Sequence, residues 1–578
     1  MSETIGSGPA PRSNPWWPNP IFRRYARSRL RPQALGAWLL VTVLLAGFLY
    51  FGFRTGTRFK GQMSIMDAER ATVIPLLVLQ ALILFFLGTG QVAAGITAEA
   101  DEGTLDYQRL SPLTPLGKVL GYLLGLPVRE WCLFAATLPF TAWALWKGEV
   151  AASAWMPVYL VLLSSALLYH LTGLVAGAVV KNRRWAFLVS IGVIFLLYTV
   201  IPQAAKFGLV YFKYLTLWPV VDENIAAMLP REAGGLLRFA RSLEPDVRFF
   251  GLHFSEAAFT LFSQSVLILT FVIMLLRRWR RAESHLLGKL WSLGLFIWMQ
   301  LMLLGNALPL IAPGLLFPSR QFTRRYLQFE NSRNWKPAVS EAVVMIGLYG
   351  VVTLLLLLVL IIIITPTPEG QIRGLQRGRK LGWTRVPRLS DAASSWGFVL
   401  AMALAGAAGW TLFAQEMLSS PWFAGHQLSP YAGPAFAMVL IGGGMACQAI
   451  LEGWGWPRLF LAGVLVGILP ILAGAIIGSI SDRTLPPAVW IGAISPLAAP
   501  GYAVAVLIPT LDLPAEVIRA VPRAFWFCQG LTVMVTLWLL VRLRQIHRSR
   551  RESVHKVETA DQDHLKYGIS DNVSNILK

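Results

Sequence analysis

The feature that most constrains this chain is the recurrence of long apolar runs from Ala34 to Val541. A membrane-spanning helix needs about 20 predominantly apolar residues, and many of these runs reach that length. Hydrophobic residues make up 55% of the 578-residue chain and charged residues only 14%, which is more apolar surface than a water-soluble protein buries within itself. Because the runs are unbroken and do not alternate with polar residues, the sequence predicts an all-α polytopic transmembrane helical bundle.

The apolar runs predict about twelve spans in two six-helix halves. The runs of the first half are 34–53, 71–95, 119–146, 153–179, 185–204 and 256–276. Those of the second half are 289–315, 339–365, 393–415, 430–452, 458–480 and 524–541. A re-entrant or interfacial segment is expected before the last span of each half, at 206–255 and at 488–509. In the second of these, breaks are expected at Ser495-Pro496 and Pro500-Gly501.

Basic clusters beside the runs predict the orientation of the chain. The net charge is +21, and such short clusters mark cytoplasmic loops, whereas nucleic-acid binding is not expected. They lie at Lys181 to Arg184, at Arg277 to Arg281, in the loop 366–392 and after Arg542. Both termini are therefore expected in the cytoplasm. The basic segment from Arg320 to Lys336 conflicts with this scheme, because the span order places it outside.

Residues 1–33 predict an amphipathic N-terminal arm. In a helix, Ile21 and Tyr25 lie on one side, whereas Arg23, Arg24 and Arg27 lie on the other. We expect this interfacial arm to lie in the cytoplasmic headgroup layer. A disordered basic tail is the alternative. No apolar stretch precedes the first span, so the first span is expected to serve as the targeting signal.

The most specific pattern is in the loop 96–118, between the second and third spans. From Glu99 the chain reads Glu-Ala-Asp-Glu-Gly-Thr-Leu-Asp-Tyr-Gln-Arg-Leu-Ser-Pro-Leu, and Gly-Lys follows at Gly117. Acidic side chains are stabilised near the positive end of a helix, and Gly103 permits a sharp turn. Leu105 and Leu110 add apolar contacts. The loop therefore favours a short element that docks on another protein, with an ordinary solvated loop helix as the alternative.

This order of residues resembles the corresponding loop of ABC-2 type ABC transporter permeases, the membrane-spanning subunits of ATP-driven transporters. The family usually has a basic residue within its first acidic pair, where this chain has Ala100 and Asp101. The Asn-Pro-Ile-Phe-Arg-Arg sequence at Asn19 and the Ile-Ser-Pro-Leu sequence at Ile494 are similar to the family's N-terminal arm and re-entrant element. The resemblance implies that six residues couple the spans to an ATPase: Glu99, Glu102, Gly103, Thr104, Leu105 and Asp106.

The resemblance also implies the partners and the location. We expect an exporter of a bacterial inner membrane that binds a cognate ABC ATPase, in two copies, which supplies the ATP and magnesium site. Four regions follow: the arm 1–33, a transmembrane half 34–288, a second half 289–545 and a polar cytoplasmic tail 546–578. The second half could be a diverged repeat, because its loop 366–392 lacks the acidic Gly-Thr-Leu pattern. One chain could then form a complete pore, and a homodimer is the alternative.

Arg129 and Glu130 are charged residues within the third predicted span. In a continuous helix from Lys118 they lie near the bilayer centre, where each unpaired charge costs about 3 kcal/mol. Since sequence neighbours on a helix point about 100° apart, we expect them not to pair with each other. They line the translocation path or hold one helix against two others. His170, Glu256 and Glu452 are expected as interface anchors nearer the span ends.

Two other function classes stay open. An ion-coupled secondary transporter could use Arg129 and Glu130 as a relay, and an intramembrane enzyme could modify lipid or polysaccharide. Against an enzyme, the seven histidines are scattered and form no HExxH motif.

Neither Gly117-Lys118 nor Gly288-Lys289 has the earlier glycine of a phosphate-binding loop. Cys132, Cys447 and Cys528 form no CxxC pair, so no metal site is expected.

Overall fold

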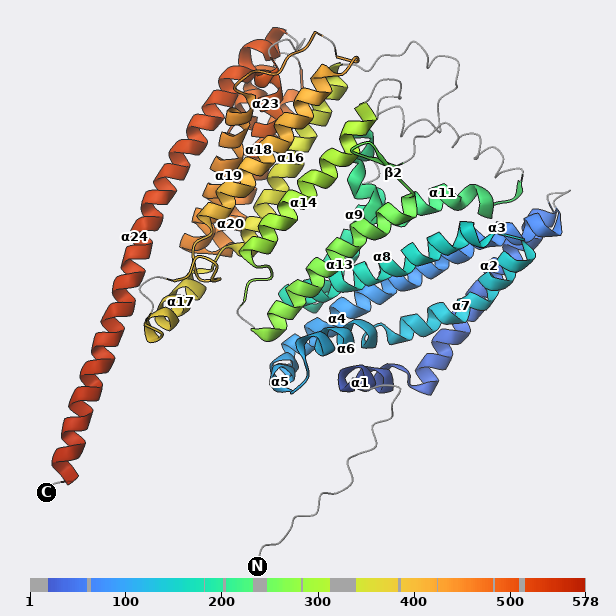
Figure 1. The fold of residues 1–578 in the computed structure, drawn as a ribbon, viewed down its shortest axis with the longest axis horizontal. Helices are drawn as coiled ribbons and strands as arrows, with labels where there is room; N and C mark the ends of the chain where they lie inside the picture. Colours follow the sequence, from blue (N-terminus) through green and yellow to red (C-terminus); the bar gives the residue numbers. More distant parts are fainter. Residues whose placement is uncertain are drawn as a thin grey trace, which may run out of the picture. The chain divides into compact units, whose positions relative to one another are not determined.

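The computed structural model describes residues 19–59, 64–180, 182–200, 204–231, 247–281, 284–311, 339–382, 386–423, 425–481, 484–508 and 515–576. Within these ranges the regular structure is almost all helical (Figure 1), and the two strands β1 (Val247–Phe249) and β2 (Leu252–Phe254) form one small hairpin. The predicted all-α class is therefore confirmed. The chain divides into two compact units. Unit 1 comprises 1–202, 212–247 and 254–282, and unit 2 comprises 203–211, 248–253 and 283–578.

Unit 1 contains helices that run from blue to green in Figure 1. They are α1 (Pro20–Arg29), α2 (Pro32–Phe59), α3 (Ile65–Ala81), the π-helix η1 (Leu82–Gly88), α4 (Thr89–Asp101), α5 (Thr104–Leu110), α6 (Pro115–Gly125), α7 (Val128–Lys147), α8 (Ala152–Val179), α9 (Arg183–Thr199), α11 (Trp218–Met228) and α13 (Glu256–Arg280). A short 3-10 helix, η3 (Val210–Leu215), precedes α11 and lies mostly in unit 1.

Helix α8 packs against α4, α9, α11 and α13 and so occupies the middle of unit 1. Its Gly173 and Gly177 face the backbone of α4. A Cβ atom on either glycine would lie within 3 Å of a carbonyl oxygen, at Thr89 for Gly173 and at Ala93 for Gly177. Small residues four positions apart allow two membrane helices to approach this closely. The α4–α8 contact therefore depends on the two glycines.

Unit 2 has a comparable series of helices. They are α14 (Lys289–Ala307), η4 (Leu308–Ile311), α16 (Val339–Ile364), α17 (Pro368–Lys380), α18 (Trp396–Ser419), α19 (Ala432–Trp454), α20 (Trp456–Ala462), the π-helix η7 (Gly463–Ile468), α21 (Leu469–Gly478), α22 (Leu485–Gly492), α23 (Ala499–Leu507) and α24 (Ala515–Ile576). The 3-10 turn η2 (Ala205–Phe207) also belongs to it. Trp410 of α18 stacks on Phe436 of α19, with ring centroids 4.2 Å apart.

Ten helices in the described part of the chain are long and apolar enough to cross a membrane, so this is a multi-pass membrane protein. Each of the ten overlaps one of the predicted runs. The run 119–146 is not one straight helix, because α6 and α7 meet at a 51° bend next to Pro127. The run 185–204 corresponds to α9, whose 17 residues are at the lower end of the roughly 17 to 25 that a crossing uses.

Where they are described, the segments predicted as re-entrant hold short helices and, at the end of 206–255, the hairpin of β1 and β2. At 488–509, α22 ends at Gly492 and α23 begins at Ala499, so the chain does break at Ser495-Pro496. Pro500 and Gly501 instead lie in the first turn of α23, where a proline is tolerated because the turn needs no N–H donor there. Residues 232–246 and the basic segment 320–336 lie outside the described residues.

The predicted polar tail 546–578 is not a separate element up to Ile576. Helix α24 runs without interruption for 62 residues from Ala515 to Ile576. Figure 1 shows this red helix continuing well past α17 towards the C-terminus. Its apolar part, Ile518–Arg550, meets the length and composition of a span. The final predicted span and the polar tail are therefore one continuous helix.

Candidate functional site

The loop 96–118 folds into the short helix α5 between two turns. Helix α4 ends at Asp101, and Gly103 has a φ of 70°, a left-handed conformation that favours glycine. The chain then reverses after Leu110, and Thr114 caps α6 by accepting a hydrogen bond from the Gly117 amide at 3.1 Å. The predicted sharp turn at Gly103 is confirmed. It places α5 beside the ends of α4 and α6.

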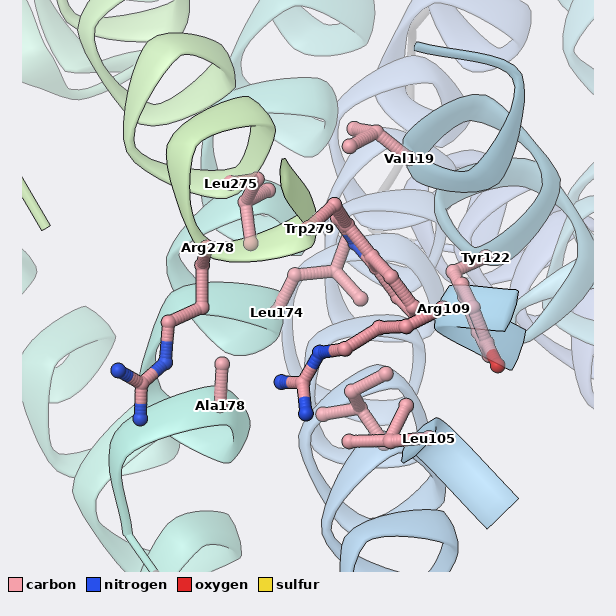
Figure 2. Close-up of a pocket in the computed structure, with 10 residues that line it drawn as sticks. Leu105, Arg109, Val119, Tyr122, Leu174, Ala178, Leu275, Arg278 and Trp279 are labelled. Atoms are coloured by element: carbon pink, nitrogen blue, oxygen red, sulfur yellow. The ribbon is translucent and has the colours of Figure 1, made fainter. Parts of the chain in front are cut away.

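The inward face of α5 lines a small pocket. Figure 2 shows Leu105 and Arg109 of α5 beside Tyr122 of α6 and Trp279 of α13. Leu174 and Ala178 of α8 complete one side, and the cavity measures about 30 Å³. Leu105 also packs against the apolar cluster formed by α1, α4, α6, α8 and α13. One face of α5 therefore contacts the ends of several long helices.

The outward face of α5 carries exposed apolar side chains. Tyr107 is 77% exposed and Leu110 is 84% exposed. Glu102 and Asp106 are also exposed, and Asp106 is bound by Arg109 one helical turn further on. Large apolar side chains beside acidic ones form a surface suited to a partner with an apolar groove and a basic rim. The sequence named both Leu105 and Leu110 as apolar contacts, and in the structure only Leu110 faces outward, whereas Leu105 packs against the apolar cluster.

Lys118 fixes the end of α5. Its side chain is buried, and its ammonium group donates to the carbonyl oxygens of Arg109 and Ser111, each at 3.2 Å. These carbonyls are in the last turn of α5 and at the residue that follows it, where a cation also interacts favourably with the helix dipole. The sequence placed Gly117-Lys118 at the end of the loop pattern and gave its lysine no structural role. Its role in the fold is to attach α5 to α6.

Glu99 is separate from the exposed acidic residues. It is buried, it accepts hydrogen bonds from the hydroxyls of Tyr25 and Tyr122, and it forms an ion pair with Arg24. Burial raises the pKa of Tyr25 to about 12, so that this hydroxyl stays a neutral donor. Glu99 therefore ties α4 to α1 and α6, while Glu102 and Asp106 remain on the surface.

The N-terminal arm forms the expected amphipathic helix, α1. Arg23 and Arg27 are exposed, whereas Ile21 and Tyr25 are buried. The apolar side packs on α6, where Gly121 and Gly125 leave room for it. A Cβ on Gly125 would lie 3.2 Å from the Cα atom of Phe22. The buried part of this face is thus occupied by protein and is not available to the lipid headgroup layer.

Arg129 and Glu130 do pair with each other, contrary to the prediction. The Glu130 Oε1 atom accepts from Arg129 Nη2 at 2.6 Å and from Arg129 Nε at 3.1 Å. They lie in the first turn of α7, after the bend at Pro127, and not within a continuous helix. The long arginine side chain reaches its neighbour, and its guanidinium also lies 4.9 Å from the ring centroid of Trp38. The pair therefore holds α7 against α2.

The expected interface anchors are buried. His170 is 1% exposed, and its Nε2 lies 2.9 Å from the Leu84 carbonyl oxygen within the π-helix η1. Glu452 is fully buried in unit 2 and accepts from Ser394 Oγ at 2.8 Å and Gln448 Nε2 at 2.7 Å. Glu256 is nearly buried and pairs with Lys213 at 3.3 Å. All three satisfy polar groups inside the protein.

A buried charge cluster on α3 was missed from the sequence. Glu69 is 1% exposed and binds Tyr50 at 2.7 Å and Arg54 at 2.9 Å. Arg70 donates to the Gly148 carbonyl at 2.6 Å. The predicted span began at 71, which left these residues outside it. Their signal was the charged sequence Asp-Ala-Glu-Arg directly before an apolar run, at the start of the same helix.

Unit 2 has its own connection between α16 and α18. It begins with α17, whose Arg373, Arg377 and Lys380 are exposed. The buried Lys289 at the start of α14 donates to four carbonyl oxygens of the segment that follows α17. Arg550 of α24 donates to Gln371 of α17 at 2.7 Å. This connection, like α5, is therefore anchored by a buried lysine, but its exposed charges are mainly positive.

No metal centre is found among the described residues, where no three His, Cys, Asp or Glu side chains are grouped to hold an ion. Comparison with known proteins gives no match, since no protein-family model, no curated protein and no solved structure resembles this chain closely enough.

Proposed function

We propose that this chain is the permease subunit of an ATP-driven exporter of the ABC-2 type, and that it moves its substrate when a separate ATPase binds α5. The observation that carries the proposal is the two-sided environment of α5. Tyr107 and Leu110 face outward, while Leu105 faces the apolar ends of the long helices. A short helix of this kind can receive movement from a partner and pass it to the spans.

The internal anchoring of α5 supports this role. Lys118 attaches its last turn to α6, and the cluster around Glu99 joins α4 and α6 to α1. A force applied to α5 is therefore transmitted to several helices. A surface loop without these bonds would move without displacing the neighbouring helices.

An ATPase is the partner that we propose, because transport against a gradient needs an energy source and this sequence has no phosphate-binding loop. The ordered resemblance of 96–118 to the permease loop points to the same partner. We propose two ATPase copies and an inner-membrane location. The exposed acidic residues Glu102 and Asp106 would face basic side chains of the ATPase.

The proposed topology has twelve spans with both termini in the cytoplasm. Two basic clusters of unit 1, Arg23 to Arg31 and Arg277 to Arg281, lie at the same end as α5, since α1 packs on α6 and α13 ends at the pocket under α5. Such an end is expected in the cytoplasm. Reporter fusions at Lys380 and Lys556 should both report a cytoplasmic position. An external position for either would overturn the span order.

The function is tested by placing a charge on the outward face of α5. In Leu110→Arg the new guanidinium enters the proposed apolar contact, so we expect normal membrane abundance with loss of the co-purifying ATPase and of its activity. Leu389→Arg is the matched control, because Leu389 is exposed to 59% at the surface of unit 2. If transport proceeds without ATP and Leu110→Arg changes nothing, the chain is an ion-coupled transporter and the proposal fails.

A further inference from the structure

Helix α13 carries a stripe of polar side chains along one side. The stripe consists of Glu256, Thr260, Ser263 and Gln264. Their spacing places them within about 100° of one another around the helix, over a length of about 12 Å. Thr260, Ser263 and Gln264 have no exposed surface, and the Glu256 side chain is only 12% exposed. The stripe is therefore a polar strip buried within a membrane-spanning helix.

Each residue of the stripe has one polar atom without a hydrogen-bond partner. These atoms are Glu256 Oε2, Thr260 Oγ1, Ser263 Oγ and Gln264 Oε1. Other hydroxyls of the same helix use the carbonyl four residues earlier. Ser265 Oγ donates to Leu261 O at 2.6 Å, and Thr270 Oγ1 donates to Val266 O at 2.8 Å. The hydroxyls of Thr260 and Ser263 do not make this bond, so they are left for another partner.

The two ends of the stripe are anchored on polar groups of neighbouring elements. At one end Lys213 of η3 donates to Glu256 Oε1 at 3.3 Å. Burial alone would lower the pKa of Lys213, but Glu256 and Tyr214 raise it, so the lysine stays charged. At the other end Gln264 Nε2 donates to Ser165 Oγ of α8 at 3.0 Å. Thr260 and Ser263 lie between these two anchored residues along the helix.

We infer that the stripe binds a row of water molecules, which connects the Lys213–Glu256 ion pair to the Gln264–Ser165 contact. Buried polar groups in proteins are almost always satisfied, and a buried water typically makes about three hydrogen bonds to such groups. Four neighbouring unsatisfied atoms meet this requirement, whereas a single one would not. The inference concerns the interior of unit 1 and does not depend on the proposed ATPase.

X-ray radiolysis of the intact membrane protein tests this directly, because hydroxyl radicals form from bound water and oxidise the side chains beside it. The probe is water itself, with oxidation read by mass spectrometry. Phe259 lies three residues after Glu256 on α13, and the centroid of its ring is 4.7 Å from that of the Tyr214 ring. Phe85 is the control, since Phe85 and Phe259 are each 2% exposed and Phe85 packs among aromatic rings. We expect several-fold faster oxidation of Phe259 and Tyr214 than of Phe85. Equal rates would overturn the inference.

A double variant provides the second test. Thr260→Val with Ser263→Ala keeps the side-chain volumes nearly unchanged and removes both hydroxyls, so oxidation of Phe259 should fall to the level of Phe85. Ser265→Ala should leave it unchanged, because that hydroxyl bonds its own helix. Unchanged Phe259 oxidation in the double variant, together with a higher thermal unfolding midpoint, would show that the hydroxyls were dry and would overturn the inference.

Discussion

The two units anchor a similar connection between long helices, but the exposed side chains of the two connections differ in charge. In each unit a short connection between the second and third long helices is held by a buried lysine that follows a glycine, Lys118 in unit 1 and Lys289 in unit 2. The connection in unit 1 exposes Tyr107, Leu110 and acidic residues, whereas α17 exposes mainly arginine and lysine. The two connections are therefore anchored alike but expose side chains of different charge and polarity.

The two π-helices extend this comparison. A π-turn leaves carbonyl groups without their usual helical donors, and π-turns are frequent at functional sites. In unit 1 the Leu84 carbonyl of η1 lies 2.9 Å from His170 Nε2. In unit 2 the Gly467 carbonyl of η7 accepts from Ser495 Oγ at 2.5 Å. In each unit, a polar side chain from another segment thus contacts a carbonyl group of the π-helix.

The largest expected effect comes from removing the lysine anchors. Lys289→Met keeps the length of the side chain but leaves four partly buried carbonyls without this donor, so we expect a loss of about 3 kcal/mol or more in stability. Lys118→Met affects two carbonyls and should cost about 1–3 kcal/mol. Thermal unfolding in detergent shows which of the two variants loses more stability. Lys147→Met is the control, because Lys147 lies over the rings of Trp143 and Trp146 without such carbonyl bonds in the structure. A larger effect for Lys118 would break the comparison.

A smaller effect is expected from the acidic residues of unit 1. Glu99→Gln removes the buried charge that pairs with Arg24, so α1 should detach more often, at a cost of about 1–3 kcal/mol. Glu102→Gln changes an exposed carboxylate and should have no measurable effect on stability. Trypsin cleavage at Arg23 and Arg27 should accelerate only in Glu99→Gln. Equal cleavage in both variants would show that Glu99 does not hold the arm.

The smallest expected effect concerns two glycines with the same conformation. Gly103 before α5 has a φ of 70° and Gly382 after α17 has a φ of 68°, and a Cβ on either would meet no atom within 4 Å. Alanine at each position should therefore cost about 1 kcal/mol through backbone strain alone. Stability measurements should give the same value for both variants. Only Gly103→Ala should also reduce ATPase association, and a reduction for Gly382→Ala alone would reverse the roles of the units.

Much of the fold follows from sequence periodicity, because length and apolarity determine which segments can cross a membrane. Ten predicted runs correspond to ten long helices. The break at Pro127 was missed, since apolar residues continue on both sides of it and hydropathy does not report the bend. The final span was predicted to end at 541, but the helix continues because charged residues such as Arg542 and Glu552 are good helix formers.

The candidate site was predicted as a segment, but not residue by residue. Glu99 was grouped with Glu102 because the two lie close together in the sequence. The sequence does not show which side chains surround Glu99 in the fold. Burial against Tyr25 and Tyr122 is a tertiary property. Leu105 and Leu110 differ in the same way, since α5 places the first over the core and the second in the open. Leu105→Arg would therefore disturb the fold itself and is a poor test of docking.

The most direct measurement of the central claim is a photo-crosslink from the outward face of α5. A photoreactive amino acid at position 110 of the full chain is irradiated in native membranes, with the same residue at position 389 as the control. The account predicts an adduct at position 110 that contains an ATPase with a phosphate-binding loop, at a yield that position 389 does not reach. An adduct only with lipid, or equal adducts at both positions, would contradict it.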